Sequence, residues 1–278
     1  MTCPNCREGF TLPGEPTGVT STEFNGAYCA AGLIPENGVA SKRAIVFLTD
    51  GFGLPLINCK LMADDFAKRL GCDVWVPDYF AGKPLIGLDV LVLPDRAGVK
   101  MSIFDWIKFI FKSLPSIPAF LASRPSVADK RVHDFIKLLK EKKQYEKIGA
   151  IGYCYGGSTV IRLAGTQLID SVVVCHPGSF SLEEVKKIRV PASWACAEED
   201  LFFPDDLRLK SEASFAERKG DNKVDFEFQR YKGIQLIIFM LGTTHGFAAR
   251  PNINILEVKE AHDKAREQAV NWFKKTLF

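Results

Sequence analysis

The sequence predicts an α/β fold in which a mostly parallel sheet carries helices on both faces. Continuous apolar runs are the first observation, because a strand covered on both faces is apolar throughout instead of alternating. Such runs occur at residues 28–31, 44–49, 73–77, 147–153, 171–175, 192–196 and 235–241. Segments with apolar residues at helical spacing alternate with them, at 61–70, 127–143, 156–166, 205–218 and 256–278. This alternation is typical of βαβ units.

Length and composition indicate a single globular domain. The chain has 278 residues, 47% hydrophobic and 25% charged, which is ordinary for a globular protein with one large core. We expect a single domain over residues 26–278, preceded by an extended, polar N-terminal arm over residues 1–25. The 36 basic and 33 acidic residues are interspersed, and no basic stripe of the kind that binds nucleic acid is visible.

The cysteines and the N-terminus indicate a cytoplasmic protein. Cys72, Cys175 and Cys196 lie in or beside apolar runs, which suits reduced thiols better than a secreted disulfide framework. No signal-peptide pattern opens the chain, and no apolar stretch is long enough to span a membrane. Cys3 and Cys6 form a lone C-x-x-C without the further pair that a zinc site needs. We therefore expect no metal, no membrane partner, and either a monomer or a homodimer.

The segment from Ile148 to Val160 holds the most informative motif. Its apolar run ends in Gly152-Tyr153-Cys154-Tyr155-Gly156 and continues into small, helix-compatible residues. This is the strand, sharp turn and helix of a nucleophile elbow, with a cysteine where G-x-S-x-G has serine. The helix N-terminus favours a thiolate. Taken alone, the motif is also compatible with a small buried cysteine.

Two further residues complete a catalytic constellation. Cys154, Asp200 and His245 each follow the carboxyl end of a different predicted strand, where α/β sheets place their ligand sites. Their order along the chain, nucleophile, acid and histidine, is that of the α/β-hydrolase fold. In such a triad the histidine takes the thiol proton and the carboxylate orients the histidine.

Each partner has competitors. His176 also ends a predicted strand, but it precedes Asp200 and would break the chain order. His133 and His262 lie in predicted helices, where we expect both to be exposed. The rivals of Asp200 are loop or helix-cap acids, namely Glu198, Glu199 and Asp205.

The turn after the strand at 44–49 supplies the remaining parts of the site. An oxyanion hole needs two N–H donors. We assign one to Tyr155 and the other to Gly51, with Phe52 as the neighbouring alternative. Asp50 in the same turn is expected beside the thiol, where a carboxylate can accept its proton. The other interpretation of Asp50 is a turn residue that caps local N–H groups.

Residues 82–126 form an insertion longer than an ordinary connection. It is rich in Pro, Phe, Ile and Leu, with apolar segments at 103–114 and 117–121. We expect a short helical insertion over the top of the sheet. It either helps to wall a pocket or packs on the surface without a role in binding, since pockets and cores use the same apolar residues.

Five segments together resemble the dienelactone hydrolase family, specifically its larger fungal branch. They are T-D-G-F-G from Thr49, V-P-D-Y-F-A-G from Val76, G-Y-C-Y-G-G from Gly152, E-E-D-L-F-F-P from Glu198 and H-G-F-A-A-R from His245. The resemblance implies an α/β-hydrolase fold, a Cys154–His245–Asp200 triad and no metal or cofactor. It also implies hydrolysis of an enol-lactone that bears a carboxylate. Within these segments we expect substrate contacts from Phe52, Tyr79, Phe203, Phe247 and Arg250.

Two departures from the family separate this chain from its bacterial members. Those members place Glu where this chain has Asp50, and they hold the substrate carboxylate with two arginines. Here Arg250 follows His245 one residue later than in them, and the second arginine is not assignable, with Arg96 and then Arg124 as weak candidates.

The apolar insertion indicates a larger substrate, such as a polyketide-derived lactone or ester. Acyl transfer, lactonisation or another biosynthetic step on the same site, and a non-catalytic binding module on a hydrolase scaffold, are the alternatives.

Overall fold

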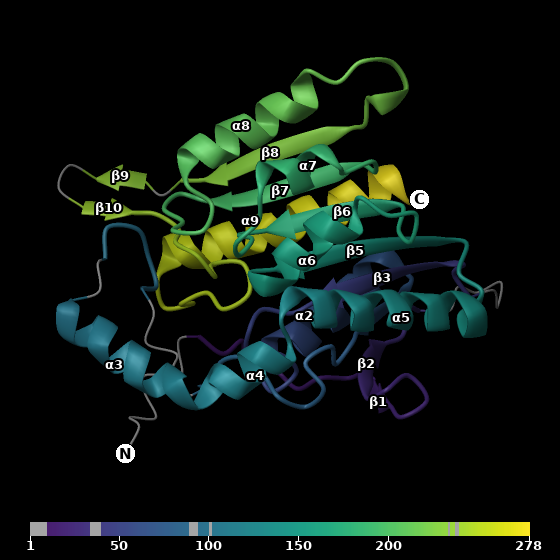
Figure 1. The fold of residues 1–278 in the computed structure, drawn as a ribbon, viewed down its shortest axis with the longest axis horizontal. Coiled ribbons are helices and arrows are strands. Elements are labelled where there is room, and N and C mark those ends of the chain that lie inside the picture. Colours follow the sequence, from purple (N-terminus) through teal and green to yellow (C-terminus); the bar gives the residue numbers. More distant parts are fainter. Residues whose placement is uncertain (1–9, 34–39, 89–93, 100–101, 233, 237–238) are drawn as a thin grey trace.

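An eight-stranded sheet organises the molecule. The computed structural model describes residues 10–33, 40–88, 94–99, 102–232, 234–236 and 239–278. The strands lie in the order β1-β2-β4-β3-β5-β6-β7-β8 (Figure 1). From β4 to β8 all neighbours are parallel, whereas β1 and β2 add an antiparallel edge. The bounds are β1 Val19–Ser21, β2 Ala27–Ala30, β3 Arg43–Leu48, β4 Asp73–Val76, β5 Lys147–Tyr153, β6 Ser171–Cys175, β7 Ala192–Ala197 and β8 Phe226–Tyr231.

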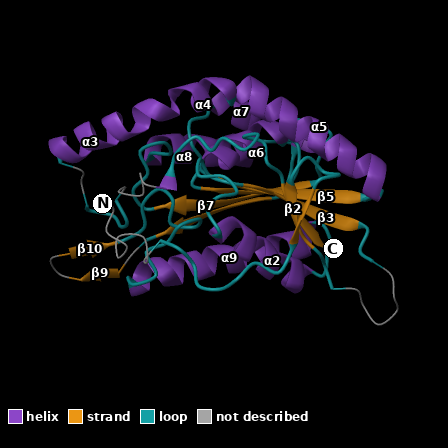
Figure 2. Ribbon diagram, turned by 90° about the horizontal axis from the view of Figure 1, so that it is seen from below, coloured by secondary structure: helices purple, strands orange, loops and turns teal. Residues whose placement is uncertain are grey.

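Helices cover both faces of the sheet, as the apolar runs predict. Figure 2 shows α2 (Asn58–Leu70) and α9 (Leu256–Thr276) on one face. The opposite layer holds α5 (Pro125–Lys143), α6 (Tyr155–Leu163), α7 (Leu182–Lys186) and α8 (Asp205–Ala216). Each face has its own buried apolar cluster. The predicted α/β-hydrolase architecture is therefore confirmed.

The register of the parallel strands gathers the functional segments at one edge. Leu48 of β3 pairs with Gly152 of β5, and Tyr153 pairs with Cys175 of β6. The turns that follow these three strands consequently start at the same level. Asp50, Cys154 and His176 stand in those turns.

The prediction of the last strand was wrong. In its described part, this run belongs to β9 (Ile234–Leu236) and β10 (Phe239–Leu241), which form an antiparallel pair separate from the eight-stranded sheet. The eighth strand is β8, parallel to β7. Its sequence, F-E-F-Q-R-Y, alternates because it lies at the sheet edge, whereas the apolar run at 235–241 has the pattern of a doubly covered strand.

The N-terminal arm is held against α2 over its described part. The side-chain oxygen of Asn58 accepts the Leu12 N–H at 2.8 Å, and its nitrogen donates to the Phe10 carbonyl at 2.8 Å. Asp64 accepts the Thr17 N–H at 2.7 Å. The arm then enters the sheet as β1. Its division from the domain at residue 25 stays a prediction, and Cys3 and Cys6 lie outside the described residues.

The insertion forms helices, and their apolar side chains face solvent. α3 (Ile103–Ser113) and α4 (Ile117–Ala122) are joined by a 3₁₀ turn, η2 (Leu114–Ser116). α3 has a Ser102–Asp105 capping box, yet none of its residues is buried. Its large apolar residues include Phe104 at 70% and Phe111 at 68% exposed. In the described residues the insertion packs on the surface, and Figure 1 shows α3 at the periphery of the molecule.

Among the described residues, no helix is both long and apolar enough to cross a bilayer.

Candidate active site

The nucleophile elbow is present and sterically exacting. Cys154 stands between β5 and α6 with φ 51° and ψ −113°, a conformation that L-residues seldom adopt. A Cβ on Gly152 would come within 2.2 Å of the Gly156 carbonyl oxygen, and one on Gly156 within 2.3 Å of the Leu48 carbonyl oxygen. Glycine at both positions is therefore what lets the strand, the turn and the helix approach so closely.

Asp200 and His245 form a bonded pair. His245 Nδ1 lies 2.9 Å and 3.0 Å from the two carboxylate oxygens of Asp200. The Asp200 carboxylate also accepts the Phe202 N–H at 2.9 Å, and its side chain is 1% exposed. The loops after β7 and β10 are tied together, because the Thr243 carbonyl accepts the N–H groups of Glu198 and Glu199 at 3.1 Å each. The acid and the histidine thus reach each other from separate elements.

The rival acids lie elsewhere. The Glu199 carboxylate accepts the Gly98 N–H at 2.8 Å. Asp205 pairs with Arg230 at 3.0 Å and with Arg208 at 3.2 Å. The Glu198 N–H donates to the Thr243 hydroxyl at 3.0 Å. In the described part of the chain, the carboxylate bonded to His245 is that of Asp200.

Two of the other histidines are less exposed than expected. His262 was expected to be exposed, yet it is 1% exposed and its Nδ1 lies 2.9 Å from the Ala248 carbonyl. The reason is that it belongs to the inner face of α9, where this hydrogen bond offsets burial. His133 is half-buried. His176 is fully buried, with its ring centroid 5.1 Å from that of His245.

The neighbours of His245 favour its charged form. Burial by itself lowers the pKa of His245, but the adjacent Cys154 and Asp200 outweigh burial and raise the pKa to about 10. A protonated His245 that is bonded to Asp200 and has Cys154 as a neighbour suits a thiolate–imidazolium pair with an orienting carboxylate. This arrangement can activate the thiol of Cys154, which is partly exposed, whereas the other described cysteines are buried free thiols.

Asp50 and Arg250 form a second charged group beside the thiol. Burial raises the pKa of Asp50 to about 6, and the Arg250 guanidinium, the Phe52 N–H and His245 limit the rise. Asp50 accepts the Phe52 N–H at 3.1 Å, while its other oxygen has no partner among the described residues. Arg250 is 5% exposed and donates to the His245 carbonyl at 3.3 Å. Burial lowers the pKa of Arg250, and Asp50 and Cys154 oppose this.

The capping interpretation of Asp50 is seen in its hydrogen bond from the Phe52 N–H. A role of its other oxygen toward the thiol stays a prediction. Because Phe52 already donates its N–H to Asp50, Gly51 remains the better assignment for the second oxyanion donor. Gly51 and Tyr155 stay predictions in that role.

The expected substrate contacts are mostly buried. Phe52, Tyr79, Phe203 and Phe247 are 2–4% exposed. The Tyr79 hydroxyl donates to the Thr49 carbonyl at 2.6 Å, so it supports the turn that carries Asp50. Phe202, which sequence reasoning passed over in favour of Phe203, is 44% exposed and lies with its ring centroid 5.0 Å from that of His245. The two phenylalanines are adjacent in one loop, and nothing in the sequence says which faces inward.

The weaker arginine candidates are not brought to the triad. Arg96 lies beside Asp95 at 4.0 Å. Arg124 is exposed and donates to the Leu121 carbonyl at 3.2 Å.

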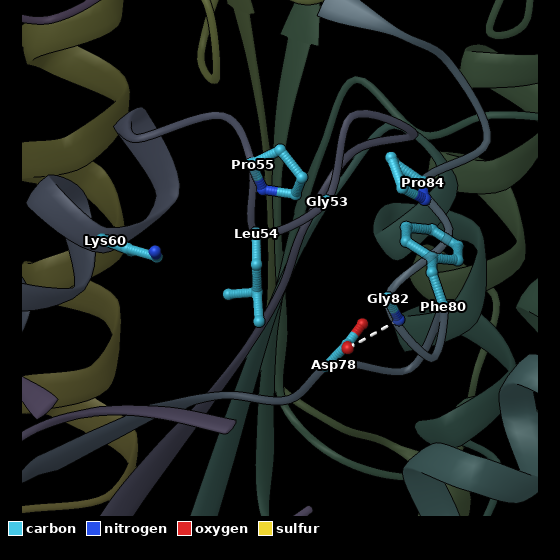
Figure 3. A pocket seen from close by; sticks show the side chains of 8 residues that line it. All are labelled: Gly53, Leu54, Pro55, Lys60, Asp78, Phe80, Gly82 and Pro84. Carbon is cyan, nitrogen blue, oxygen red and sulfur yellow. Dashed lines mark hydrogen bonds between the residues drawn. The ribbon is translucent and has the colours of Figure 1, made fainter. Parts of the chain in front are cut away.

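A hollow of about 300 Å³ adjoins the site without containing it (Figure 3). Its lining includes neither the triad nor the insertion helices; it comprises Gly53, Leu54, Pro55, Lys60, Asp78, Phe80, Gly82 and Pro84. The ring of Phe80 packs edge-on against Tyr155, the residue after the nucleophile, at 5.4 Å. The hollow therefore lies one side chain away from the elbow.

Comparison with known proteins decides the family. The model of the dienelactone hydrolase family matches residues 30–277. The chain belongs to the dienelactone hydrolase family. It is accordingly a hydrolase of ester or lactone bonds, and the resemblance seen in the sequence is confirmed.

The relatives and solved structures agree with this assignment. Hydrolase pyvD of Aspergillus violaceofuscus is 30% identical over 272 residues, covering 98% of this chain and 96% of that protein. Hydrolase tropI of Talaromyces stipitatus is 31% identical over 268 residues, covering 96% and 94%. A human carboxymethylenebutenolidase homolog is 24% identical over 255 residues, covering 88% and 86%.

Among solved structures, a dienelactone hydrolase-like phosphotriesterase, P91, from metagenomic libraries superimposes with a TM-score of 0.57 at 15% identity, covering 90% of this chain and 92% of that one. A putative dienelactone hydrolase from Klebsiella pneumoniae gives 0.55 at 13% identity, covering 89% and 92%. These likenesses show the shared fold.

The elbow's packing is testable by adding one methyl group. Gly156→Ala places a Cβ against the Leu48 carbonyl, so we expect it to lower the free energy of unfolding by about 3 kcal/mol or more. Gly165→Ala, near the far end of α6, meets nothing closer than 3.3 Å and should change it by less than about 1 kcal/mol. Urea denaturation measures both. Equal stabilities for the two variants would contradict the close approach.

The charged His245 predicts an unusually reactive thiol in mildly acidic solution. At pH 6 we expect iodoacetamide to alkylate Cys154 ahead of the buried cysteines, with the site located by peptide mass mapping. Asp200→Asn removes the carboxylate that helps hold the proton on His245, so alkylation at pH 6 should slow by about tenfold or more. Glu199→Gln is the matched control and should leave the rate unchanged. An unchanged rate in Asp200→Asn would contradict the pairing.

Proposed function

We propose that the protein hydrolyses an enol-lactone or a similarly activated ester through a thioester formed on Cys154. The observation that carries this proposal is the bonded His245–Asp200 pair beside a cysteine held at a strained elbow. The names of the relatives support the reaction class: two are called hydrolases and one a carboxymethylenebutenolidase homolog.

Acylation is the first half of the proposed reaction. The Cys154 thiolate adds to the carbonyl carbon, and the oxyanion is held by the N–H groups of Gly51 and Tyr155. The carbon–oxygen bond then breaks, which opens the ring of a lactone, and the enolate takes the proton of the His245 imidazolium and becomes a ketone. A thiolate is suited to this step because an enolate is a good leaving group; amides and simple alkyl esters are poorer substrates for it.

Deacylation regenerates the enzyme. His245, now neutral, takes a proton from water while the water oxygen adds to the thioester carbonyl. The carbon–sulfur bond breaks, the acid product leaves, and the thiolate again faces the imidazolium. Asp200 holds the ring in the tautomer that exposes its other nitrogen throughout. No metal or cofactor takes part in this proposal.

Asp50 and Arg250 act together in this scheme. In the resting thiolate–imidazolium pair His245 carries the proton, and the free oxygen of Asp50 is proposed as a second acceptor for the thiol proton. Arg250 compensates the carboxylate inside the protein, which is why a buried Asp50 is tolerated at all. The guanidinium of Arg250 that compensates Asp50 is also the group that would bind a substrate carboxylate. Phe52, Tyr79, Phe203 and Phe247 remain the proposed aromatic contacts of the substrate.

The natural substrate is proposed to be a small-molecule lactone or ester of secondary metabolism, larger than the small bacterial dienelactone. A cytoplasmic setting and a monomeric or homodimeric state belong to the same proposal, supported by the buried free thiols. Hydrolysis is favoured over acyl transfer because two fungal relatives that cover nearly the whole chain are named hydrolases.

Turnover of a chromogenic enol ester tests the reaction class. We expect hydrolysis by the wild type to exceed that of a matched alkyl ester by about 10² or more, because the better leaving group departs without further activation. Cys154→Ser and His245→Ala should each lower kcat by about 10³ or more. Glu199→Gln serves as the control. Full activity of Cys154→Ser would contradict a thiol nucleophile.

Removal of the Asp50 carboxyl group should have opposite effects on activity and on stability at neutral pH. Asp50→Asn removes a group with a pKa of about 6, so kcat/KM should fall and lose its dependence on pH near 6. The stability effect follows from the raised pKa. The protonated carboxyl group of Asp50 contributes stability to the folded state below about pH 4, and this contribution is lost as the pH rises through 6. Asp50→Asn should therefore raise the unfolding free energy at pH 7 by about 1–3 kcal/mol and leave it unchanged near pH 4.

Asp50→Glu is the conservative comparison for the same experiment. It restores the carboxylate of the bacterial enzymes and should keep kcat/KM within about tenfold of wild type while retaining the pH dependence near 6. A loss of stability at pH 7 in Asp50→Asn would contradict the inference that burial destabilises the charged form of Asp50 in the folded protein.

A further inference from the structure

His176 is a buried histidine that the triad does not use. It follows the last residue of β6, is 0% exposed and has a φ of 33°, in the left-handed region. Neither ring nitrogen has a hydrogen-bond partner among the described residues. An apolar ring at this position would avoid the cost of burying two polar nitrogens.

The surroundings of the ring point toward the catalytic histidine. The ring centroid of His176 lies 5.1 Å from that of His245, with the two planes at 73°, an edge-to-face contact. Phe247 at 5.7 Å and Tyr153 at 5.9 Å pack around His176 as well. His245 is therefore bonded to Asp200 at Nδ1 and contacted by the ring of His176, which is itself buried between Tyr153 and Phe247.

The backbone next to His176 holds the nucleophile. The Cys175 carbonyl accepts the Cys154 N–H at 3.2 Å, and the Gly178 N–H donates to the Cys154 carbonyl at 2.8 Å. Pro177 lies against the start of α6, since a Cβ on Gly157 would come within 2.9 Å of its Cα. The segment 175–178 therefore hydrogen-bonds both the N–H and the carbonyl of Cys154, and the His176 side chain of the same segment contacts His245.

We propose that His176 is a positioning residue, which fixes the ring of His245 relative to the elbow that carries Cys154. This inference rests on the proposed thiol mechanism. The contact with the His176 ring restricts the orientation of the His245 imidazole between Asp200 and Cys154. The proton can then move between the His245 ring and the Cys154 sulfur without prior rotation of the imidazole. A misplacement of about 1 Å at such a site costs up to about 10² in rate.

His176 does this as a neutral ring. Burial holds the pKa of His176 well below its usual range, and the positive charges of His245 and Arg250 lower it further. The other groups packed around it are the rings of Tyr153 and Phe247, which carry no charge at neutral pH. The positive charge at this point of the site therefore belongs to His245 and Arg250.

Three variants test the inference with an enol ester as substrate. His176→Ala should lower kcat by about 10–10² with KM within about twofold of wild type, and should slow iodoacetamide alkylation of Cys154 at pH 6 by about tenfold. His176→Phe keeps a ring edge against His245 and should retain both rates within about threefold. Val174→Ala, a buried change on the same strand that lies in the opposite apolar cluster, should leave both rates unchanged.

The outcomes separate this inference from the mechanism beneath it. Wild-type kcat and alkylation in His176→Ala, or a folded His176→Phe as slow as the alanine variant, would overturn the positioning role. If the alanine variant does not fold, His176→Leu fills the space without a ring and is expected to show the same loss. Retained activity in Cys154→Ser would instead defeat the proposed mechanism, whatever His176 does.

Discussion

The left-handed backbone of Cys154 is the constraint from which the site follows. Holding a cysteine at φ 51° requires that strand β5 and helix α6 meet at contact distance, which only Gly152 and Gly156 allow. The neighbouring strands then secure the turn: the Thr49 carbonyl accepts the Gly156 N–H at 3.1 Å, and the end of β6 bonds the Cys154 backbone. The strain is offset by the centre of the sheet, where β5 lies between β3 and β6.

Charge is the second theme of the site. Two acids, Asp50 and Asp200, and two bases, His245 and Arg250, are nearly enclosed around one thiol. Enclosure strengthens each interaction and also makes any unpaired member costly. Asp200 is hydrogen-bonded to His245 through Nδ1, whereas one oxygen of Asp50 and Nε2 of His245 have no hydrogen-bond partner among the described residues. The roles proposed above, an orienting Asp200 and a proton-accepting Asp50, correspond to this difference between the two carboxylates.

Much of this was predictable from sequence, and the failures have physical causes. The strands of the sheet centre and the Cys154–Asp200–His245 order follow from apolar runs ending in reactive residues, and the structure brings all three to one edge. The eighth strand was missed because the residues of this edge strand alternate, whereas the described part of the apolar run at 235–241 forms the separate β9–β10 pair. His262 was placed on the wrong face of its helix. Burial of Tyr79 and Arg250, and the contact of His176 with His245, depend on tertiary packing that no local pattern encodes.

The central claim, that this elbow makes Cys154 a covalent nucleophile, is tested most directly by trapping the acyl-enzyme. Rapid mixing with an enol ester, acid quench within the first turnover and intact-mass analysis should show one acyl group per chain, located on the Cys154 peptide and lost in Cys154→Ser. Product formation without any acylated protein at early times, or an adduct on another residue, would contradict the account.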